Sequence, residues 1–379
     1  MQYKNYGKTG KRVSCVGFGG MRFDLKRSKE ENAELVRYAC SRGINYFDTA
    51  PGYCDDLSEE IFGLAFKDMP GEFYASTKAM PVDFDTAEKA KAQVRKSLDR
   101  LGLAKIHFYH IWCLRKMEHY ELAMRPGGQY DGLLELQREG LIEHIVCSSH
   151  QPGAEIRRVV ADGKVEGVLM GLNILNFPYR WDGVRAAAEH GCGVVAMNPL
   201  GGGLIPEHER ELAFLAGPGE TPTEAALRFL IACPEISVTL VGLGTREQVD
   251  MACRVAERAT PFTAQDLERV RGRIGANMNA MCTGCSYCEG CPQNIPIASY
   301  MQYFNEKQVF GKSDEAMIKG LDFQHDWGLL VGRQAEAAAC IECAQCEEAC
   351  TQHLPIISRL KEIAEWEVLE AQKNKPPDA

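Results

Sequence analysis

The sequence contains no apolar run that approaches the roughly 18 residues of a membrane-spanning helix. Its first ten residues are polar, and they lack the basic stretch and apolar core of a secretory signal. There is also no cluster of Lys and Arg of the kind that binds nucleic acid. We therefore expect a cytoplasmic protein whose partners include neither a membrane nor a nucleic acid.

Basic side chains are scarce at the C-terminal end of the chain. From residue 281 onward there are 15 acidic and 8 basic side chains, a net charge of −7, which leaves −2 of the total −9 for the first 280 residues. This excess of acidic side chains favours solubility, or it forms a docking face for a basic partner protein.

Cysteine is abundant, with 16 residues in a chain of 379. Because the expected compartment is reducing, we do not expect disulfides. Eight cysteines, such as Cys15, Cys40, Cys192 and Cys233, are scattered through apolar or helical stretches and are expected to be packed thiols. The other eight form two tight runs, and such runs are typical of metal binding.

The spacing within the two runs favours iron-sulfur clusters. The first run comprises Cys282, Cys285, Cys288 and Cys291, and the second comprises Cys340, Cys343, Cys346 and Cys350. Two-residue gaps let three successive thiolates surround one 4Fe-4S cubane. The alternative is a pair of zinc sites, but these usually combine two cysteine pairs across a longer loop. The runs therefore predict two 4Fe-4S clusters.

We expect the ligands of the two clusters to be exchanged between the runs. In two-cluster ferredoxins the fourth cysteine of each run ligates the other cluster. Cys350 would then complete the cluster of Cys282, Cys285 and Cys288. Cys291 would complete the cluster of the second run, although the two-residue gap before Cys291 is less typical of this arrangement.

Short apolar stretches alternate with longer amphipathic ones along the first 260 or so residues, as in repeated βα units. The expected strands cover residues 13–18, 44–48, 73–78, 106–112, 142–148, 167–172, 193–197 and 237–242. Eight parallel strands in this length fit a (β/α)8 TIM barrel. We expect the barrel at residues 1–262, a connecting helix at 263–280, and a small, mainly α-helical ferredoxin-like domain at 281–379.

Polar residues follow the second and third expected strands. Asp48 ends the second strand, Tyr53 follows five residues later, and Lys78 ends the third. With these residues the sequence resembles the aldo-keto reductase family, in particular its bacterial branch with a C-terminal ferredoxin-like extension. The resemblance covers nearly the whole chain and includes residues 17–21 (GFGGM), 196–200 (AMNPL), 240–242 (LVG) and 282–292 (CTGCSYCEGCP).

The resemblance implies a role for each of these side chains. Tyr53 would be the general acid that protonates a carbonyl oxygen, Lys78 would lower the pKa of the phenol, and Asp48 would hold the ammonium. The histidine that the family carries at the end of the fourth strand is replaced by Trp112, which cannot titrate. His110 lies two residues earlier on the same strand face, as a substitute for that histidine or as a buried core residue.

The resemblance also places an NADPH or NADH site at the ends of the later strands. Its residues would be Ser148, Ser149, Met197, Pro199, Leu200, Gly242 and Arg246. Several family features are absent, because a serine replaces the expected asparagine at Ser149 and a leucine replaces the expected glutamine at Leu169. Arg246 is the one cation near the expected phosphate site in the sequence. These residues support a nicotinamide cofactor weakly.

The sequence thus predicts an iron-sulfur oxidoreductase in which a nicotinamide-linked barrel reduces a small carbonyl or related substrate, with a basic electron-transfer protein as partner. The alternative is an electron-transfer or scaffold protein whose barrel has lost carbonyl reduction, since Trp112 interrupts the catalytic set. Clusters pass single electrons and nicotinamides pass hydrides, and no flavin motif is visible to connect the two.

Overall fold

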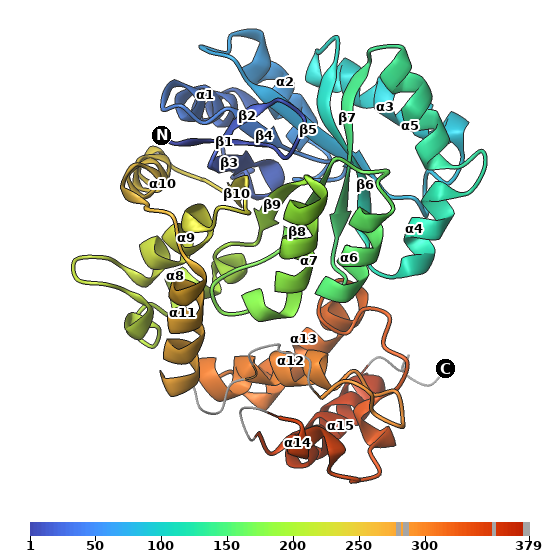
Figure 1. The fold of residues 1–379 in the computed structure, drawn as a ribbon, viewed down its shortest axis with the longest axis vertical. Helices are drawn as coiled ribbons and strands as arrows, with labels where there is room; N and C mark the ends of the chain where they lie inside the picture. The colour runs from blue at the N-terminus through green and yellow to red at the C-terminus, as the bar shows by residue number, and fades with distance from the viewer. Residues whose placement is uncertain (278–281, 283–287, 351–353, 374–379) are drawn as a thin grey trace. The chain divides into compact units, whose positions relative to one another are not determined.

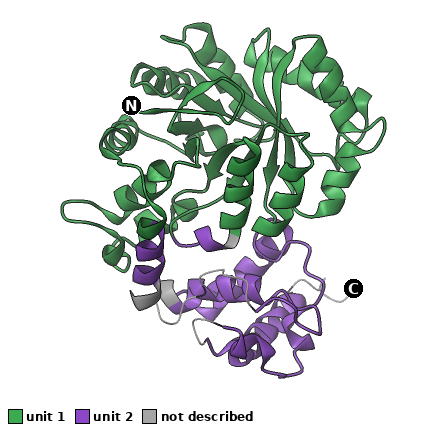
Figure 2. Ribbon diagram, viewed as in Figure 1, with its two compact units in different colours: residues 1–174, 180–266 green, residues 175–179, 267–379 purple. Residues whose placement is uncertain are grey.

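The computed structural model describes residues 1–277, 282, 288–350 and 354–373. The chain forms two compact units, which Figure 2 shows in different colours. Unit 1 contains Met1–Ile174 and Arg180–Asp266, and unit 2 contains Leu175–Tyr179 and Leu267–Ala379. No helix in the described part of the chain is long and apolar enough to cross a membrane.

Unit 1 is a closed barrel of eight parallel strands in the order β10-β3-β4-β5-β6-β7-β8-β9 (Figure 1). The predicted TIM barrel is therefore confirmed, and each predicted strand is present. The strands are β3 (Val16–Gly19), β4 (Tyr46–Asp48), β5 (Tyr74–Ala79), β6 (Ile106–Leu114), β7 (Ile142–Ser149), β8 (Gly167–Gly171), β9 (Gly193–Met197) and β10 (Val238–Val241).

Helices follow the strands and bury their apolar faces. They are α1 (Lys29–Ser41), α2 (Ser58–Lys67), α3 (Ala87–Leu101), α4 (Met117–Met124), α5 (Gln129–Arg138), α6 (Gly153–Ala161), α7 (Phe177–His190), α8 (Leu204–Glu207), α9 (Pro222–Ala232) and α10 (Arg246–Arg258). Helix α9 begins with the expected capping box, in which Thr221 accepts from the Glu224 N–H and the Glu224 side chain accepts from the Thr221 N–H. Such caps contribute about 1 kcal/mol each.

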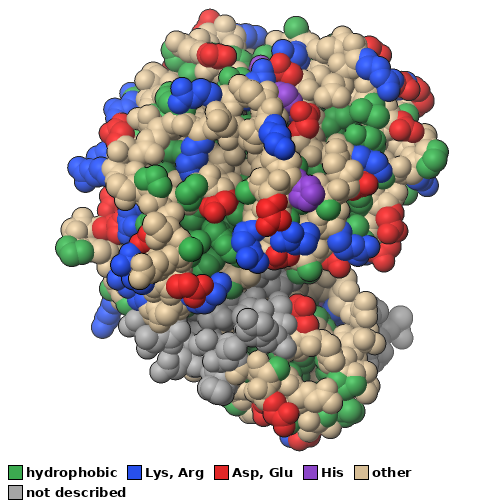
Figure 3. Space-filling model, in the orientation of Figure 1, with side chains coloured by type: hydrophobic (Ala, Val, Ile, Leu, Met, Phe, Trp, Pro, Cys, Tyr) green, Lys and Arg blue, Asp and Glu red, His purple; other side chains and the backbone are tan. Residues whose placement is uncertain are grey.

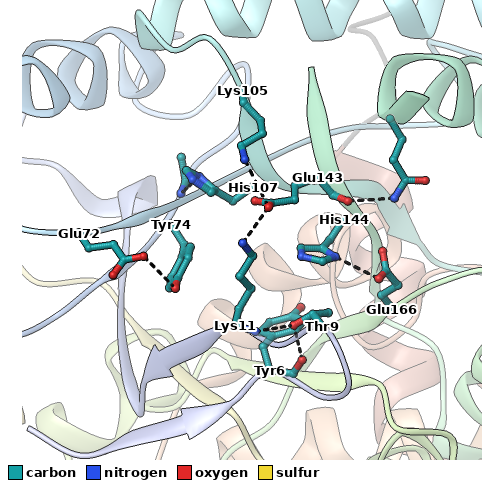
Figure 4. Close-up of polar contacts among 12 residues, drawn as sticks. Tyr6, Thr9, Lys11, Glu72, Tyr74, Lys105, His107, Glu143, His144 and Glu166 are labelled. Carbon is teal, nitrogen blue, oxygen red and sulfur yellow. Dashed lines mark hydrogen bonds and ion pairs between the residues drawn. The ribbon is translucent and has the colours of Figure 1, made fainter. Parts of the chain in front are cut away.

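An antiparallel hairpin covers the amino ends of the barrel strands. Strands β1 (Tyr3–Asn5) and β2 (Arg12–Ser14) form it. The sequence predicted one strand at residues 13–18, but the chain breaks at Cys15, so that residues 13–14 belong to β2 and residues 16–18 to β3. The Tyr6 ring enters the barrel core and lies 4.3 Å from the Phe108 ring. Figure 4 shows the polar contacts at this end, where Glu143 pairs with Lys11 and Lys105. In barrels of this type the amino-terminal face serves stability.

The barrel interior is a layer of apolar side chains that alternate with outward-facing neighbours. Tyr46, Tyr74, Phe108, Val146, Leu169, Val195, Val238 and Leu240 form this layer. Side chains alternate between the two faces of a strand, so the residue two positions after each layer residue also projects into the barrel, nearer the carboxyl ends of the strands. On the outside, Figure 3 shows acidic and basic side chains interspersed over one face of unit 1.

Unit 2 is mainly helical in its described residues. It contains most of α11 (Ala264–Asn277), then α12 (Ile297–Phe310), α13 (Asp314–Asp326), α14 (Gln345–Glu348) and α15 (Ile356–Lys373). Its core lies between α12, α13 and α15, where the Phe304 and Trp366 rings stack with centroids 5.6 Å apart. The Tyr300 hydroxyl donates to Glu367, which joins α12 to α15 inside this core.

Candidate active site and metal centre

Asp48 and Lys78 form a buried ion pair at the carboxyl ends of β4 and β5. Their side chains are 3% and 1% exposed, and the Lys78 ammonium donates to Asp48 Oδ1. Burial lowers the pKa of Lys78, and the Asp48 carboxylate opposes that change. A buried pair of this kind is a weak source of stability, because desolvation offsets much of the attraction. Its place at the end of a barrel favours a role in catalysis.

Two further side chains extend this pair into a polar chain. The Ser76 hydroxyl lies 2.7 Å from Asp48 Oδ2 and 2.9 Å from His110 Nε2. Since the Cys147 carbonyl can only accept, His110 Nδ1 carries the proton that it shares with this oxygen over 3.1 Å. Burial lowers the pKa of His110 to about 4, so the ring is neutral near pH 7 and Nε2 is an acceptor. His110 is fully buried and lies beside Ser76, which contacts Asp48.

Tyr53 lies in the loop between β4 and α2, next to the buried pair. The Lys78 ammonium lies 5.2 Å from the centre of the Tyr53 ring. The loop is fixed by Asp56, whose carboxylate accepts from the Gly52 N–H over 2.8 Å and from Arg100 over 2.8 Å. The three residues that follow Tyr53 have a left-handed backbone conformation, with a φ of 55° at Cys54 and similar values at Asp55 and Asp56. The loop therefore holds Tyr53 by backbone shape as well as by packing.

The acidity of Tyr53 differs from the expectation. Burial raises the pKa of Tyr53, and the Asp48 carboxylate raises it further. A phenolate is more costly to form in this surrounding than in water, so the hydroxyl keeps its proton across the neutral range. The resemblance implied a pKa lowered by Lys78, whereas burial and Asp48 act in the opposite direction in this structure.

Trp112 lies in a β-bulge at the end of β6. The pairing of β6 with β7 shifts register between Ile111 and Leu114, and Cys113 has a φ of 61°. Bulges of this kind redirect side chains near active sites. The Trp112 ring meets the Tyr53 ring edge-on, with centroids 5.7 Å apart. Trp112 therefore packs its ring against Tyr53 and provides no titratable group.

Part of the expected cofactor set points into the barrel. Ser148 and Met197 follow the core layer by two residues on β7 and β9, as Asp48 does on β4 and Ser76 does on β5. The Ser148 hydroxyl is buried and has no hydrogen-bond partner among the described residues, as a donor reserved for a ligand would be. Ser149 is used within the protein, because its hydroxyl lies 3.1 Å from the Gln151 N–H and 3.3 Å from the Leu114 carbonyl. Leu169 belongs to the core layer.

The loop after β10 has more positive charge than the sequence suggested. Gly242 and Arg246 flank this loop, and Arg246 stacks on the Tyr38 ring at 4.8 Å. Arg27, which precedes α1, donates to the Gly244 carbonyl over 2.9 Å, and the stem of Arg22 packs against Gly242. We missed Arg22 and Arg27 because they are more than 200 residues away in the sequence. Pro199 and Leu200 lie in the turn after β9.

Five of the cysteines in the two runs surround one cavity in unit 2. The cavity has a volume of about 200 Å³ and is lined by Cys288, Cys291, Cys340, Cys343 and Cys346. Burial raises the pKa of the Cys346 thiol to about 11, which a bound metal would reverse. Cys291, from the first run, thus lies beside three cysteines of the second run, as exchanged ligation requires. Cys288, which that arrangement assigns to the other cluster, lines the same cavity.

The two remaining described cysteines of the runs lie together in the core of unit 2. Cys282 and Cys350 are each 8% exposed and belong to one apolar cluster. Both interact electrostatically with Arg359 of α15. The Leu354 N–H lies 3.5 Å from Cys350 Sγ and donates to it. Cys285 lies outside the described residues.

The scattered cysteines are free thiols, as expected. Seven of them are buried and Cys54 is partly buried. Burial raises the pKa of the most enclosed ones, for example Cys147 and Cys233. They pack as small apolar side chains.

Comparison with known proteins identifies both parts of the chain. The model of the aldo/keto reductase family matches residues 15–215, and that of the 4Fe-4S dicluster domain matches residues 281–354. L-galactose dehydrogenase of Arabidopsis thaliana is 27% identical over 280 residues, which are 66% of this chain and 86% of that protein. Pyridoxine 4-dehydrogenase of Escherichia coli (strain K12) is 26% identical over 240 residues, 58% of this chain and 82% of that protein.

Solved structures agree on the fold. An aldo-keto reductase of Bacillus halodurans superposes with a TM-score of 0.61 at 24% identity, and the match covers 72% of this chain and 96% of that one. The barrel, the buried Asp48–Lys78 pair facing Tyr53, and the matched family model agree with one another. This chain belongs to the aldo/keto reductase family of oxidoreductases and has a C-terminal 4Fe-4S domain.

Proposed function

We propose that the barrel transfers a hydride between a nicotinamide and a small carbonyl or alcohol substrate. The observation that carries this proposal is the buried Asp48–Lys78 pair beneath the Tyr53 ring, at the carboxyl end of the barrel. The relatives named above support it, since one is named for oxidising a sugar and the other for oxidising pyridoxine. A small polar substrate with an oxidisable hydroxyl group is the class common to both.

The described residues fit a phosphate-bearing dinucleotide. Ser148 offers a buried hydroxyl to the carboxamide, and Met197 offers an apolar surface to the ring. Arg22, Arg27 and Arg246 surround the loop before α10, where a helix N-terminus and guanidinium groups favour phosphate. When bound, the nicotinamide supplies the hydride.

The proton comes from the chain itself. Tyr53 Oη donates it to the carbonyl oxygen as negative charge develops there. The ammonium of Lys78 stabilises the phenolate that is left, and Asp48 holds the ammonium in place. Ser76 donates to the second oxygen of Asp48 and fixes it, and the neutral His110 lies beside Ser76. Trp112 packs against Tyr53 and limits the space for substrate.

We further propose that the C-terminal domain holds two 4Fe-4S clusters with exchanged ligation. The cavity lined by Cys291 together with Cys340, Cys343 and Cys346 supports one of them. The joint burial of Cys282 and Cys350 supports the other. Its remaining ligands would be Cys285 and Cys288, and Cys288 also lines the cavity of the first. We propose that the clusters exchange single electrons with a basic partner in the cytoplasm, separately from hydride transfer.

Two variants test the barrel chemistry. Tyr53→Phe should abolish NADPH-dependent reduction of a small aldehyde, since the proton donor is lost. Trp112→His should raise it, because one positioned hydrogen-bonding group of this kind is worth on the order of a hundredfold in rate. Iron and sulfide contents equal to those of the unmodified protein serve as the folding control.

The opposite outcome has a definite meaning. If Tyr53→Phe retains the rate of the unmodified protein and Trp112→His leaves it unchanged, the barrel does not reduce carbonyls in this way. The protein is then better described as an electron-transfer or scaffold protein.

A further inference from the structure

Arg359 is a buried cation in the core of unit 2. It lies on the first turn of α15 and is only 4% exposed. Its guanidinium group lies over the Phe304 ring, 4.9 Å from the ring centre. Burial lowers the pKa of Arg359, but an arginine keeps its charge at every pH at which a protein is folded. A charge in such a place is costly and is retained only with compensating groups nearby.

Two cysteines of the runs and the Glu362 carboxylate are among the compensating groups. Arg359 interacts electrostatically with both Cys282 and Cys350. Phe304, on which it stacks, belongs to the same apolar cluster as these two cysteines. Asn305, the next residue, fixes Cys282 by accepting from its N–H over 2.7 Å and donating to its carbonyl over 2.8 Å. Helix α12 therefore contributes both the ring that the guanidinium stacks on and the side chain that fixes the Cys282 backbone.

We propose that Arg359 raises the reduction potential of the buried cluster, the one held by Cys282 and Cys350. This proposal rests on the proposed function, since it assumes two clusters with exchanged ligation. A cluster with four thiolates becomes more negative when it takes up one electron. A fixed positive charge beside it stabilises that reduced state, and the effect is large because water does not screen it.

The second cluster has a different electrostatic surrounding. The residues that line its cavity include Ile297 and Ile357, in the first turns of α12 and α15. Each helix N-terminus carries only about half an elementary charge. The Glu347 carboxylate accepts from the Ile357 N–H over 2.8 Å and offsets one of these dipoles. Cys343 is exposed, so water also stabilises the reduced form there.

The role of Arg359 follows from this contrast. Burial without a cation disfavours the added electron and would lower the potential of the inner cluster far below that of the outer one. The guanidinium offsets the burial. Arg359 thereby keeps the two potentials close enough for electrons to pass between the clusters.

The test is an anaerobic redox titration followed by electron paramagnetic resonance, in the unmodified protein and in Arg359→Met. Met has similar length and packs on Phe304 without charge. We expect one of the two midpoint potentials to fall by about 59 mV or more. For a one-electron couple this is about a tenfold change in the equilibrium constant of reduction. Arg359→Lys should keep most of the potential because it keeps the charge.

Lys361→Met is the matched control. Lys361 is two residues away on the same helix, but its side chain is 58% exposed and pairs with Glu342 at 2.8 Å. Water screens its charge, so the midpoint that falls in Arg359→Met should stay where it is in Lys361→Met.

The outcomes separate this inference from the proposed function. An unmodified protein with far fewer than about eight irons per chain would contradict the two clusters themselves. Two intact clusters whose midpoints are unchanged in Arg359→Met, or lowered equally in Arg359→Met and Lys361→Met, would overturn the role of Arg359. If Arg359→Met lacks iron, Arg359→Gln is judged by the same midpoints.

Discussion

At the scale of single residues, a row of polar side chains leads from His110 through Ser76 and Asp48 to the ammonium of Lys78. The Ser76 hydroxyl has one proton and two neighbouring acceptors, Asp48 Oδ2 and His110 Nε2. The carboxylate is charged and is therefore the stronger acceptor. We infer that Ser76 donates to Asp48, and that this second hydrogen bond keeps the carboxylate oriented toward Lys78.

Reduction should show no alkaline loss of the proton donor up to pH 9. A general acid is active while protonated, and its activity falls as the pH rises through its pKa. Burial and Asp48 raise the pKa of Tyr53 above its ordinary value near 10, so the phenol stays protonated below that pH. The measurement is kcat for aldehyde reduction between pH 6 and pH 9. An alkaline limb centred below pH 9 would contradict the raised pKa.

The sequence predicted the site residues that belong to one motif, but not those that come into contact only through the fold. Asp48, Tyr53 and Lys78 could be found by their spacing along two strands. Ser76 could have been suspected, because period-two alternation places it on the same face as Lys78. Arg27 meets the loop after β10 only because the barrel closes between β3 and β10, and local sequence carries no such information.

At the scale of elements, strand periodicity predicted all eight barrel strands but not the hairpin in front of them. Strands β1 and β2 are three residues each, too short for a period to be recognised. The bulge that carries Trp112 was also invisible, since Cys113 is a residue type that rarely adopts positive φ. These two departures shape the opposite ends of the barrel.

Tyr6→Ala should lower the free energy of unfolding by about 3–5 kcal/mol, as for other large buried aromatic side chains. The Tyr6 ring is fully buried and closes the amino-terminal end of the core. Its hydroxyl has no hydrogen-bond partner among the described residues, so Tyr6→Phe should cost little and serves as the control. Urea unfolding followed by circular dichroism measures both. Equal losses in the two variants would contradict the packing role.

Single cysteine replacements should reveal the exchanged ligation. Cys350→Ser and Cys282→Ser should alter the same cluster signal in electron paramagnetic resonance, because both thiols lie together in the core. Cys291→Ser and Cys343→Ser should alter the other signal, since both line the cavity. If Cys350→Ser and Cys343→Ser instead change the same signal, each run closes around its own cluster.

At the scale of the whole molecule, charge is distributed unequally along the chain. Residues 281–379 carry a net charge of −7, against −2 for the first 280. In the described part of the second run, Glu342 and Glu348 are exposed on either side of Cys343. Lys361 pairs with Glu342, so an electron acceptor that approaches this cluster meets negative charge mainly at Glu348.

Electron transfer from the reduced clusters to a basic protein such as cytochrome c should slow as the ionic strength rises. Exposed charges are screened beyond about 10 Å at 0.1 M salt. Ferricyanide, an anionic acceptor, provides the control and should show the opposite dependence. Stopped-flow rates between about 0.01 and 0.3 M salt decide the matter, because the Debye length falls from about 30 Å to below about 8 Å over this range. A cytochrome rate that is indifferent to salt would count against electrostatic docking.

The most direct test of the account is an anaerobic titration of the reconstituted protein with NADPH, with nicotinamide fluorescence and cluster absorbance followed together. We predict saturable binding, weakened by Ser148→Ala and by Arg27→Met, with no bleaching of the clusters, because the sequence shows no flavin motif that would convert a hydride into single electrons. Absence of binding at millimolar NADPH would contradict the central claim that the barrel is a nicotinamide-dependent oxidoreductase.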